Sequence, residues 1–178
     1  VSSMVQSIID TFGNEQQKQK YLPELTSGQA IGAFALSESG AGSDAASLKT
    51  TAKKVEGGYI LNGSKLWITS GGIAKTYVVM ARTGAEGSKG VSAFIVEDGT
   101  KGFEYGKKER KMGWNISPTR ELLFDNCFVP EENLLQQEGM GFKVAMSALD
   151  RGRITIGAIA VGLSQRALDE AVNYSLER

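Results

Sequence analysis

Histidine is absent from this chain of 178 residues, and cysteine occurs once, at Cys127. Without histidine, these residues alone cannot form a Ser-His-Asp or Cys-His catalytic group or a histidine-ligated metal site. A single cysteine forms neither an internal disulfide nor a thiolate metal cluster, and it is compatible with a reducing compartment. We therefore expect no metal site and no hydrolase of the triad type.

Net charge and long apolar runs are also missing. The 20 basic residues balance 20 acidic ones, whereas nucleic-acid and anionic-membrane binders need a basic excess. No apolar run approaches the roughly 20 residues that span a bilayer, and the first residues lack the basic-then-apolar pattern of a secretory signal. The sequence therefore predicts a globular protein that is not secreted, with no membrane span and no nucleic-acid partner.

Proline is scarce, with three residues, but glycine is abundant, with 22. The glycines separate short apolar or alternating runs, a pattern typical of strands joined by turns. Turns are predicted at 56–58 and, as a hairpin signal, at Asn62-Gly63. The stretch from about 30 to 130 therefore predicts an antiparallel β-barrel or sandwich, with strands at 31–36, 48–55, 59–61, 65–69, 76–81, 91–96, 103–105 and 120–129.

Helical periodicity frames this stretch on both sides. Residues 2–12 repeat apolar side chains at helical spacing after a serine cap, and Gly13 ends them. Asn14 caps a polar helix over 15–20, which we expect to end in the segment around Pro23. A further helical pattern runs from Gly139 to the last residue without a glycine or proline stop. This arrangement predicts a truncated piece of a larger helix–barrel–helix protein.

A glycine- and serine-rich loop follows the first predicted strand, with the sequence LSESGAGSD over 36–44. Its two glycines let backbone N–H groups approach a ligand, and its hydroxyl groups can bind a phosphate or the edge of a heterocycle. The loop is neither a GxGxxG sequence nor a P-loop. An ordinary β-turn is an equally good interpretation, because Gly, Ser and Asp are the usual turn residues.

Two further motifs carry candidate ligand groups. Trp67 and Thr69 flank Ile68, so strand alternation places both on one face, where an indole and a hydroxyl suit a flat cofactor. The alternative is a half-buried tryptophan in the sheet wall. Asp150 and Arg153 share a helix face; they either clamp an anionic, nucleotide-like substrate or form only a surface ion pair.

Three segments together resemble the acyl-CoA dehydrogenase family, in the order and spacing of that family. They are ALSESGAGSD at 35–44, YILNGSKLWITSGG at 59–72, and a third segment with GMGF at 139–142, LDRGR at 149–153 and YSLER at 174–178. The likeness covers essentially the whole chain. Residues 107–115 with 118–120 are most similar to the short branched-chain, isobutyryl-CoA type. Ser39 stands where the family commonly has proline, which makes the loop less rigid but removes no ligand group.

The resemblance implies an α+β fold, in which an antiparallel β-barrel middle domain is flanked by α-helices. It places the end of an N-terminal helical domain at 1–29, the barrel at 30–130 and the start of a C-terminal helical domain at 131–178. It implies FAD as the cofactor, bound by Phe34, Leu36, Ser37, Gly42, Ser43, Trp67, Ile68, Thr69 and Arg178. The residues implied for the acyl-CoA substrate are Ser43, Asp150 and Arg153.

The implied reaction is α,β-dehydrogenation of an acyl-CoA thioester, in which a carboxylate removes the α-proton and the β-hydride passes to the flavin. In most of the family the base is a glutamate farther along the C-terminal domain than Arg178. In the isovaleryl type it lies at the position of Gly152, which has no side chain to act. We therefore expect no catalytic base within these residues.

The resemblance also implies partners and a location. An electron-transfer flavoprotein is the expected electron acceptor, and the full-length protein is expected to be a homodimer or homotetramer. It is expected in the cytoplasm of a bacterium or the mitochondrial matrix of a eukaryote. Two alternatives stay open: a flavin- or acyl-CoA-binding module without turnover, and a related flavoenzyme such as an acyl-CoA oxidase or nitroalkane oxidase.

Overall fold

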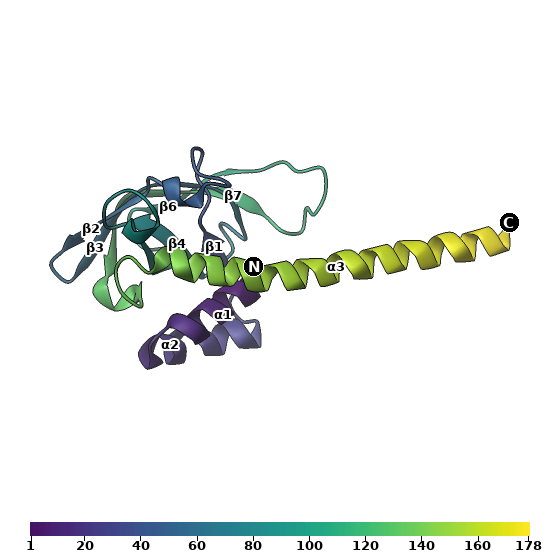
Figure 1. The fold of residues 1–178 in the computed structure, drawn as a ribbon, viewed down its shortest axis with the longest axis horizontal. Coiled ribbons are helices and arrows are strands. Elements are labelled where there is room, and N and C mark those ends of the chain that lie inside the picture. The colour runs from purple at the N-terminus through teal and green to yellow at the C-terminus, as the bar shows by residue number, and fades with distance from the viewer.

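The computed structural model describes all 178 residues, which form two short helices, an eight-stranded sheet and one long helix (Figure 1). The helices are α1 (Ser2–Phe12), α2 (Glu15–Ser27) and α3 (Gly141–Glu177). The strands are β1 (Gly32–Ala35), β2 (Thr51–Val55), β3 (Gly58–Thr69), β4 (Thr76–Arg82), β5 (Val91–Glu97), β6 (Phe103–Lys108), β7 (Thr119–Pro130) and β8 (Leu134–Leu135). Three single-turn 3₁₀ helices, η1 (Ala45–Ser47), η2 (Ser88–Gly90) and η3 (Glu131–Asn133), lie between strands.

The junction between α1 and α2 forms as predicted. The Gly13 N–H donates to the carbonyl of Ile9 at 2.8 Å and ends α1. The Asn14 side chain accepts from the Gln17 N–H, and the Gln17 side chain accepts from the Asn14 N–H, each at 2.9 Å, so a capping box starts α2. The expected serine cap of α1 is absent, because the Ser2 hydroxyl instead accepts from the backbone N–H of Gly32 in β1 at 3.1 Å.

Helix α2 does not end near Pro23 as predicted, but continues through it to Ser27. Proline removes one helical N–H donor, and the carbonyl left without it lies in the exposed residue Gln19. Tyr21 and Leu25, one turn apart, are both buried in the core shared with α1. Their burial keeps the segment helical until Gly28 ends it in the left-handed conformation, at φ 79°.

The sheet is mixed rather than antiparallel throughout. Its strands run in the order β6-β7-β3-β2-β4-β5-β8, with β1 added beside β4 in parallel. The hairpin of β2 and β3 lies between β1 and β4 in sequence and supplies the long crossover that a parallel pair needs. The end strands β6 and β8 do not pair with each other. The predicted closed antiparallel barrel is therefore not confirmed.

The sheet nevertheless curls around one aromatic core. Tyr59 of β3 contacts Phe94 of β5, and Tyr77 of β4 contacts Phe103 of β6, each with ring centroids 4.9 Å apart. Neither pair of strands is adjacent in the sheet. Only strong curvature brings such rings together, so one face of the sheet encloses its own core.

The predicted hairpin at Asn62-Gly63 is wrong, because β3 runs unbroken through both residues. The turn between β2 and β3 lies at Glu56-Gly57, where Gly57 has a φ of 74°. Gly63, at φ 140°, instead marks an irregularity where the register with β7 shifts. The side-chain amide oxygen Oδ1 of Asn62 accepts from the backbone N–H of Asn126 across this irregularity at 2.8 Å. The Asn-Gly pair thus forms a bulge-like site within a long strand.

The outer face of β4 and β5 forms a second core with the helices. Val144, Ala145 and Ala148 on the first turns of α3 are buried there together with residues of α1 and α2. From residue 153 onward every residue of α3 is exposed, and Figure 1 shows this part of the helix projecting away from the sheet. The helical pattern predicted from Gly139 onward thus forms one continuous helix of 37 residues. No helix is both long and apolar enough to cross a membrane.

Candidate functional site

The structure brings together the 36–44 loop and the tryptophan strand. The backbone N–H of Leu66 in β3 donates to the carbonyl of Ser37 at 2.9 Å. Leu66 directly precedes Trp67, so two motifs about thirty residues apart in sequence lie side by side. This pairing brings the start of the 36–44 loop to the segment that carries Trp67, and the exposed groups of the two segments make up the candidate surface.

A bulge in β3 presents Trp67 to solvent. The register with β7 shifts between Lys65 and Ile68, and Trp67 has a φ of 57°, in the left-handed region. Its side chain is 63% exposed, whereas Ile68 is buried in the aromatic core. Thr69 is partly exposed. The indole and the Thr69 hydroxyl therefore lie on the outer face of the sheet, and Ile68 faces inward.

Polar groups on this surface are free to meet a ligand. The hydroxyls of Ser37, Ser43 and Thr69 make no hydrogen bond within the chain, although many other hydroxyls do. A Cβ built on Gly42 would meet no atom within 4 Å, so space is open where the loop backbone faces outward. The backbone N–H groups of Gly42 and Ser43 donate no backbone hydrogen bond. Donors and open space thus coincide in the loop.

Phe34 and Leu36 support the loop from the helix side. Alternate residues of β1, Ala33 and Ala35, face the aromatic core, whereas Leu36 is buried in the core shared with the helices and Phe34 packs against it. Leu36 is too buried to offer much surface to a ligand, with 8% exposure. Its contribution is the placement of Ser37, the residue that follows.

Sequence reasoning missed a buried ion pair behind this surface. The ammonium of Lys65 lies 2.6 Å from a carboxylate oxygen of Glu38, and it also donates to the carbonyl of Leu36 at 3.2 Å. The Lys65 side chain is wholly buried. Glu38 also accepts the backbone N–H groups of Lys49, at 2.6 Å, and Thr50, at 3.0 Å. The signal was present as a lysine among apolar strand residues and a glutamate in a glycine-rich loop, but neither position alone indicates its partner.

The pair is charged at neutral pH. Burial lowers the pKa of Lys65 to about 8, against the opposing effect of Glu38. Burial alone would raise the pKa of Glu38, but the Lys65 ammonium and the hydrogen bonds from Thr50 and Lys49 outweigh it and hold that pKa below its ordinary value. Each group therefore favours the charged form of the other.

Arg82 holds the far end of the same loop. Its guanidinium donates to the carbonyls of Ala46, at 2.6 Å, and Leu48, at 3.0 Å, on either side of the end of η1. It also donates to Ala85, at 2.6 Å, and Gly87, at 3.1 Å, in the loop between β4 and β5. One side chain thus ties η1, which follows Ser43 and Asp44, to a neighbouring loop.

The predicted residues of α3 are not brought to this surface. The Arg153 Nε lies 3.9 Å from an oxygen of Asp150, and both side chains are 80% exposed. Arg178 lies at the end of the projecting helix, with its guanidinium 5.3 Å from the ring centroid of Tyr174. Within the chain as described, these residues form surface contacts only.

Gly152 and Arg153 do line a separate groove between α1 and α3. This groove has a volume of about 500 Å³ and a mainly apolar lining that includes Met4, Leu149 and Ile156. A Cβ on Gly152 would lie 3.5 Å from the sulfur of Met4, an ordinary contact. The position is therefore open enough for a side chain that this sequence does not have.

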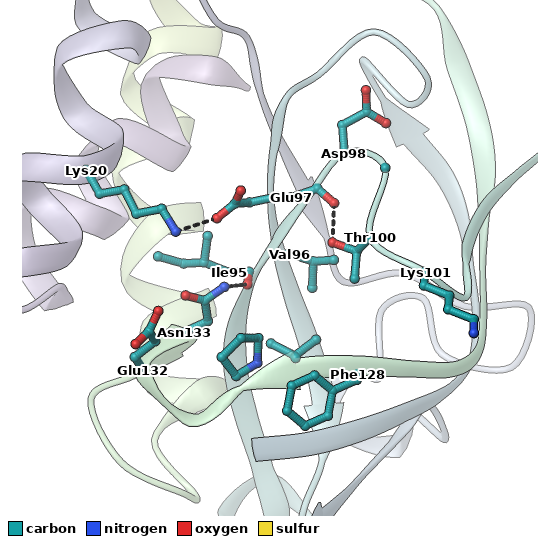
Figure 2. Close-up of a pocket in the computed structure, with 13 residues that line it drawn as sticks. Lys20, Ile95, Val96, Glu97, Asp98, Thr100, Lys101, Phe128, Glu132 and Asn133 are labelled. Carbon is teal, nitrogen blue, oxygen red and sulfur yellow. Dashed lines mark hydrogen bonds and ion pairs between the residues drawn. The ribbon is translucent and has the colours of Figure 1, made fainter. Parts of the chain in front are cut away.

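A different cleft, of about 580 Å³, lies beside α2 and the ends of β5 and β7 (Figure 2). In Figure 2, Lys20 pairs with Glu97 at 2.7 Å and Asn133 donates to the carbonyl of Ile95 at 3.0 Å, whereas Asp98, Lys101 and Glu132 have no partner among the residues drawn. None of the predicted site residues lines it. Three of its polar side chains, those of Lys20, Glu97 and Asn133, hold α2 and η3 to the sheet, and the cleft is separate from the candidate surface.

Family models match three successive parts of the chain. The model described as acyl-CoA dehydrogenase, middle domain, matches residues 33–127. The models of the N-terminal and C-terminal domains of acyl-CoA dehydrogenase match residues 1–29 and 139–178. The surface of the 36–44 loop and Trp67 lies within the middle match.

Individual proteins are similar over almost the whole chain. An acyl-CoA dehydrogenase of Bacillus subtilis is 56% identical over 94% of this chain and 44% of its own length. The mitochondrial isobutyryl-CoA dehydrogenase of Dictyostelium discoideum is 50% identical over 98% of this chain and 42% of its own length. The structure of butyryl-CoA dehydrogenase from Megasphaera elsdenii superposes with a TM-score of 0.96 at 50% identity, covering 99% of this chain and 46% of that one. The chain thus spans less than half the length of these relatives.

Proposed function

Because this chain belongs to the acyl-CoA dehydrogenase family, we propose that it forms the flavin-binding portion of an enzyme that dehydrogenates an acyl-CoA thioester. In this proposal residues 1–29 end a helical domain, residues 30–130 form the middle domain with a barrel-like sheet, and residues 131–178 start a second helical domain. The observation that carries the proposal is the exposed Trp67 beside a loop of free hydroxyl and N–H donors.

The residues of this surface fit FAD. An isoalloxazine ring is flat and apolar on its faces and polar at its edges, which matches an exposed indole next to unpaired hydroxyls. The open space at Gly42 admits a ligand close to the loop backbone. We propose Trp67 as the ring wall, Ser37 and Thr69 as edge donors, and Gly42 and Ser43 as partners of the chain that carries the phosphates. Ile68, whose side chain is buried, is proposed to line the ring edge beside Thr69 through its backbone. Phe34 and Leu36 back the loop, and Arg178 is a further FAD contact.

FAD, when bound, supplies the acceptor for the hydride that leaves the β-carbon of the thioester. The residues of this chain then orient the cofactor and the substrate and stabilise the charge that forms on the flavin ring. Hydroxyl and amide donors at the ring edge favour negative charge there. Ser43, Asp150 and Arg153 are proposed to hold the CoA portion, with Arg153 supplying a planar set of donors. No residue at the family base positions is available here, so the α-proton is removed by a group outside these residues.

The substrate, acceptor and location follow from the family. We propose a short or branched acyl-CoA, because relatives named for butyryl- and isobutyryl-CoA are each 50% identical to the chain. An electron-transfer flavoprotein is the proposed acceptor, and a homodimer or homotetramer the proposed assembly. The proposed compartment is the mitochondrial matrix in a eukaryote, since the name of the Dictyostelium relative gives that protein as mitochondrial, and the cytoplasm in a bacterium.

The test uses two tryptophans that differ chiefly in position. Trp67 and Trp114 are 63% and 66% exposed, and both have a φ of 57°. Trp67→Ala and Trp114→Ala are made in the whole protein that carries this chain, and FAD affinity is measured by quenching of flavin fluorescence. We expect Trp67→Ala to weaken FAD binding about tenfold, because one stacking face is lost, and Trp114→Ala to change it little. Equal effects of the two substitutions, or no FAD binding by the unaltered protein, would refute the proposal.

A further inference from the structure

Glu38 is the point where three parts of the middle domain meet. Its carboxylate accepts from Lys65 of β3 and from the backbone N–H groups of Lys49 and Thr50, which lead into β2. Glu38 itself lies in the 36–44 loop, directly after Ser37. One side chain therefore connects the loop to both strands of the neighbouring hairpin.

Lys65 completes the connection from the strand side. Its ammonium donates to the Leu36 carbonyl as well as to Glu38. The next residue, Leu66, donates its N–H to the Ser37 carbonyl at 2.9 Å. Three successive loop residues, 36–38, are thus bonded to two successive residues of β3, immediately before the bulge that presents Trp67.

Neither member of the pair can itself contact a bound ligand to any extent. The side chain of Lys65 has no exposed surface and that of Glu38 has 9%. A buried ion pair is also a poor source of stability, because desolvation of both charges offsets their attraction, and a well-packed apolar pair serves as well. The geometry thus favours placement of the loop over stability as the role of this pair.

We propose that Glu38 and Lys65 are positioning residues, whose buried ion pair holds the 36–44 loop against β3 so that the loop donors and Trp67 face one ligand. This inference rests on the proposed function for its ligand, FAD. It adds two residues that do not touch the cofactor but set the distance between the two halves of its site.

The experiment replaces the pair as a unit. Glu38→Gln/Lys65→Met removes both charges with little change in shape and leaves no unpaired buried charge. The matched control is Lys54→Met/Glu131→Gln, which removes an ion pair of 3.1 Å whose side chains are 60% and 58% exposed. Each variant is made in the whole protein. Three quantities are measured: urea stability, FAD affinity, and amide hydrogen exchange without FAD at residues 49, 50 and 66.

We expect the buried double variant to remain folded with a urea midpoint close to that of the unaltered protein. Its amides at 49, 50 and 66 should exchange about tenfold faster, because local opening of the loop costs less, while those of β4 and β5 stay protected. Its FAD affinity should fall about tenfold, and the control should match the unaltered protein in all three measurements.

The outcomes separate the two proposals. Unchanged exchange at the three amides overturns the positioning role, whatever happens to FAD. Faster exchange with unchanged FAD affinity also overturns it, because the loop would then move without consequence for the ligand. A general loss of stability with faster exchange throughout the sheet would show a structural role only. If the unaltered protein binds no FAD, the proposed function fails, and with it the cofactor role of the pair, while the exchange measurement still decides whether the pair holds the loop.

Discussion

The hydroxyl of Tyr59 donates a hydrogen bond of 2.7 Å to a carboxylate oxygen of Glu138, and so joins the aromatic core of the sheet to the segment that leads into α3. Burial raises the pKa of Tyr59, and the nearby carboxylate of Glu138 raises it further. The N–H of Gly139, the next residue, donates to the Ser92 hydroxyl at 2.9 Å. Two adjacent contacts thus fix where the long helix starts relative to the sheet.

Tyr59→Phe should lower the free energy of unfolding by about 1 kcal/mol, because it removes one hydrogen bond whose acceptor, the exposed Glu138, water can then solvate. The aromatic contact with Phe94 is kept, so the change in the free energy of unfolding measures the contribution of the Tyr59 hydroxyl alone. Urea unfolding followed by circular dichroism measures the change. Tyr174→Phe, on the exposed part of α3, is the control and should be neutral. A neutral Tyr59→Phe would show that the contact contributes nothing to stability.

Arg82→Lys should lower the free energy of unfolding by about 2 kcal/mol, although it keeps the charge. The guanidinium of Arg82 reaches four carbonyl groups, and a single ammonium cannot span them. Trypsin should also cut faster after Lys89, in the loop that loses its anchor. The exposed Arg166 serves as the control, since Arg166→Lys keeps a simple surface ion pair with Glu170. Equal effects of the two substitutions would contradict this role of Arg82.

The pairing of the Glu97 carboxylate makes the free energy of unfolding depend on pH in the acidic range. The ammonium of Lys20, at 2.7 Å, and the hydroxyl of Tyr21, at 2.7 Å, donate to this carboxylate and hold its pKa below the ordinary value of 4.5. Below that pH the unfolded chain binds a proton that the folded chain does not, so the stabilising effect is present at neutral pH and is lost as the pH falls through the folded-state pKa.

Glu97→Gln should therefore flatten the fall in stability between pH 7 and about 3. The measurement is urea unfolding at intervals of pH for the unaltered protein and the variant. Glu24→Gln, which removes a looser surface pair of 3.6 Å with Lys75, is the control. If both variants lose stability as steeply as the unaltered protein, the Glu97 pairing has no part in the acid response.

The sequence correctly predicted the helix ends that are fixed by hydrogen bonds between neighbouring residues. Gly13 and Asn14 mark a helix end and a helix start because their caps are made by residues within four positions. Pro23 and Asn62-Gly63 misled, because tertiary contacts outweighed them: burial of Tyr21 and Leu25 carried the helix onward, and pairing with β7 kept β3 continuous through the turn signal.

The exposed groups of the candidate site were predictable from the sequence, but the buried ion pair behind them was not. Trp67 and the 36–44 loop stood out by composition and by family resemblance, and the structure places them side by side. The ion pair of Glu38 and Lys65 joins residues 27 positions apart, and a single sequence contains no sign of which charges meet. The parallel pairing of β1 with β4 was also missed, because one sequence does not show which distant strands pair. Short strands joined by turns instead predict antiparallel pairing.

These 178 residues alone should not dehydrogenate an acyl-CoA thioester. Removal of the α-proton needs a base within hydrogen-bond reach, and loss of such a base lowers the rate by about 10²–10⁴-fold. Gly152 supplies no side chain, and the carboxylate of Asp150 is 80% exposed and faces Arg153 on its own helix. We therefore expect no rapid bleaching of the flavin when the chain, saturating FAD and butyryl- or isobutyryl-CoA are mixed without oxygen. Asp150→Asn is the matched variant, because it keeps the shape of the side chain and removes its basicity. Rapid bleaching in the unaltered chain that disappears in Asp150→Asn would overturn this prediction and identify Asp150 as the base.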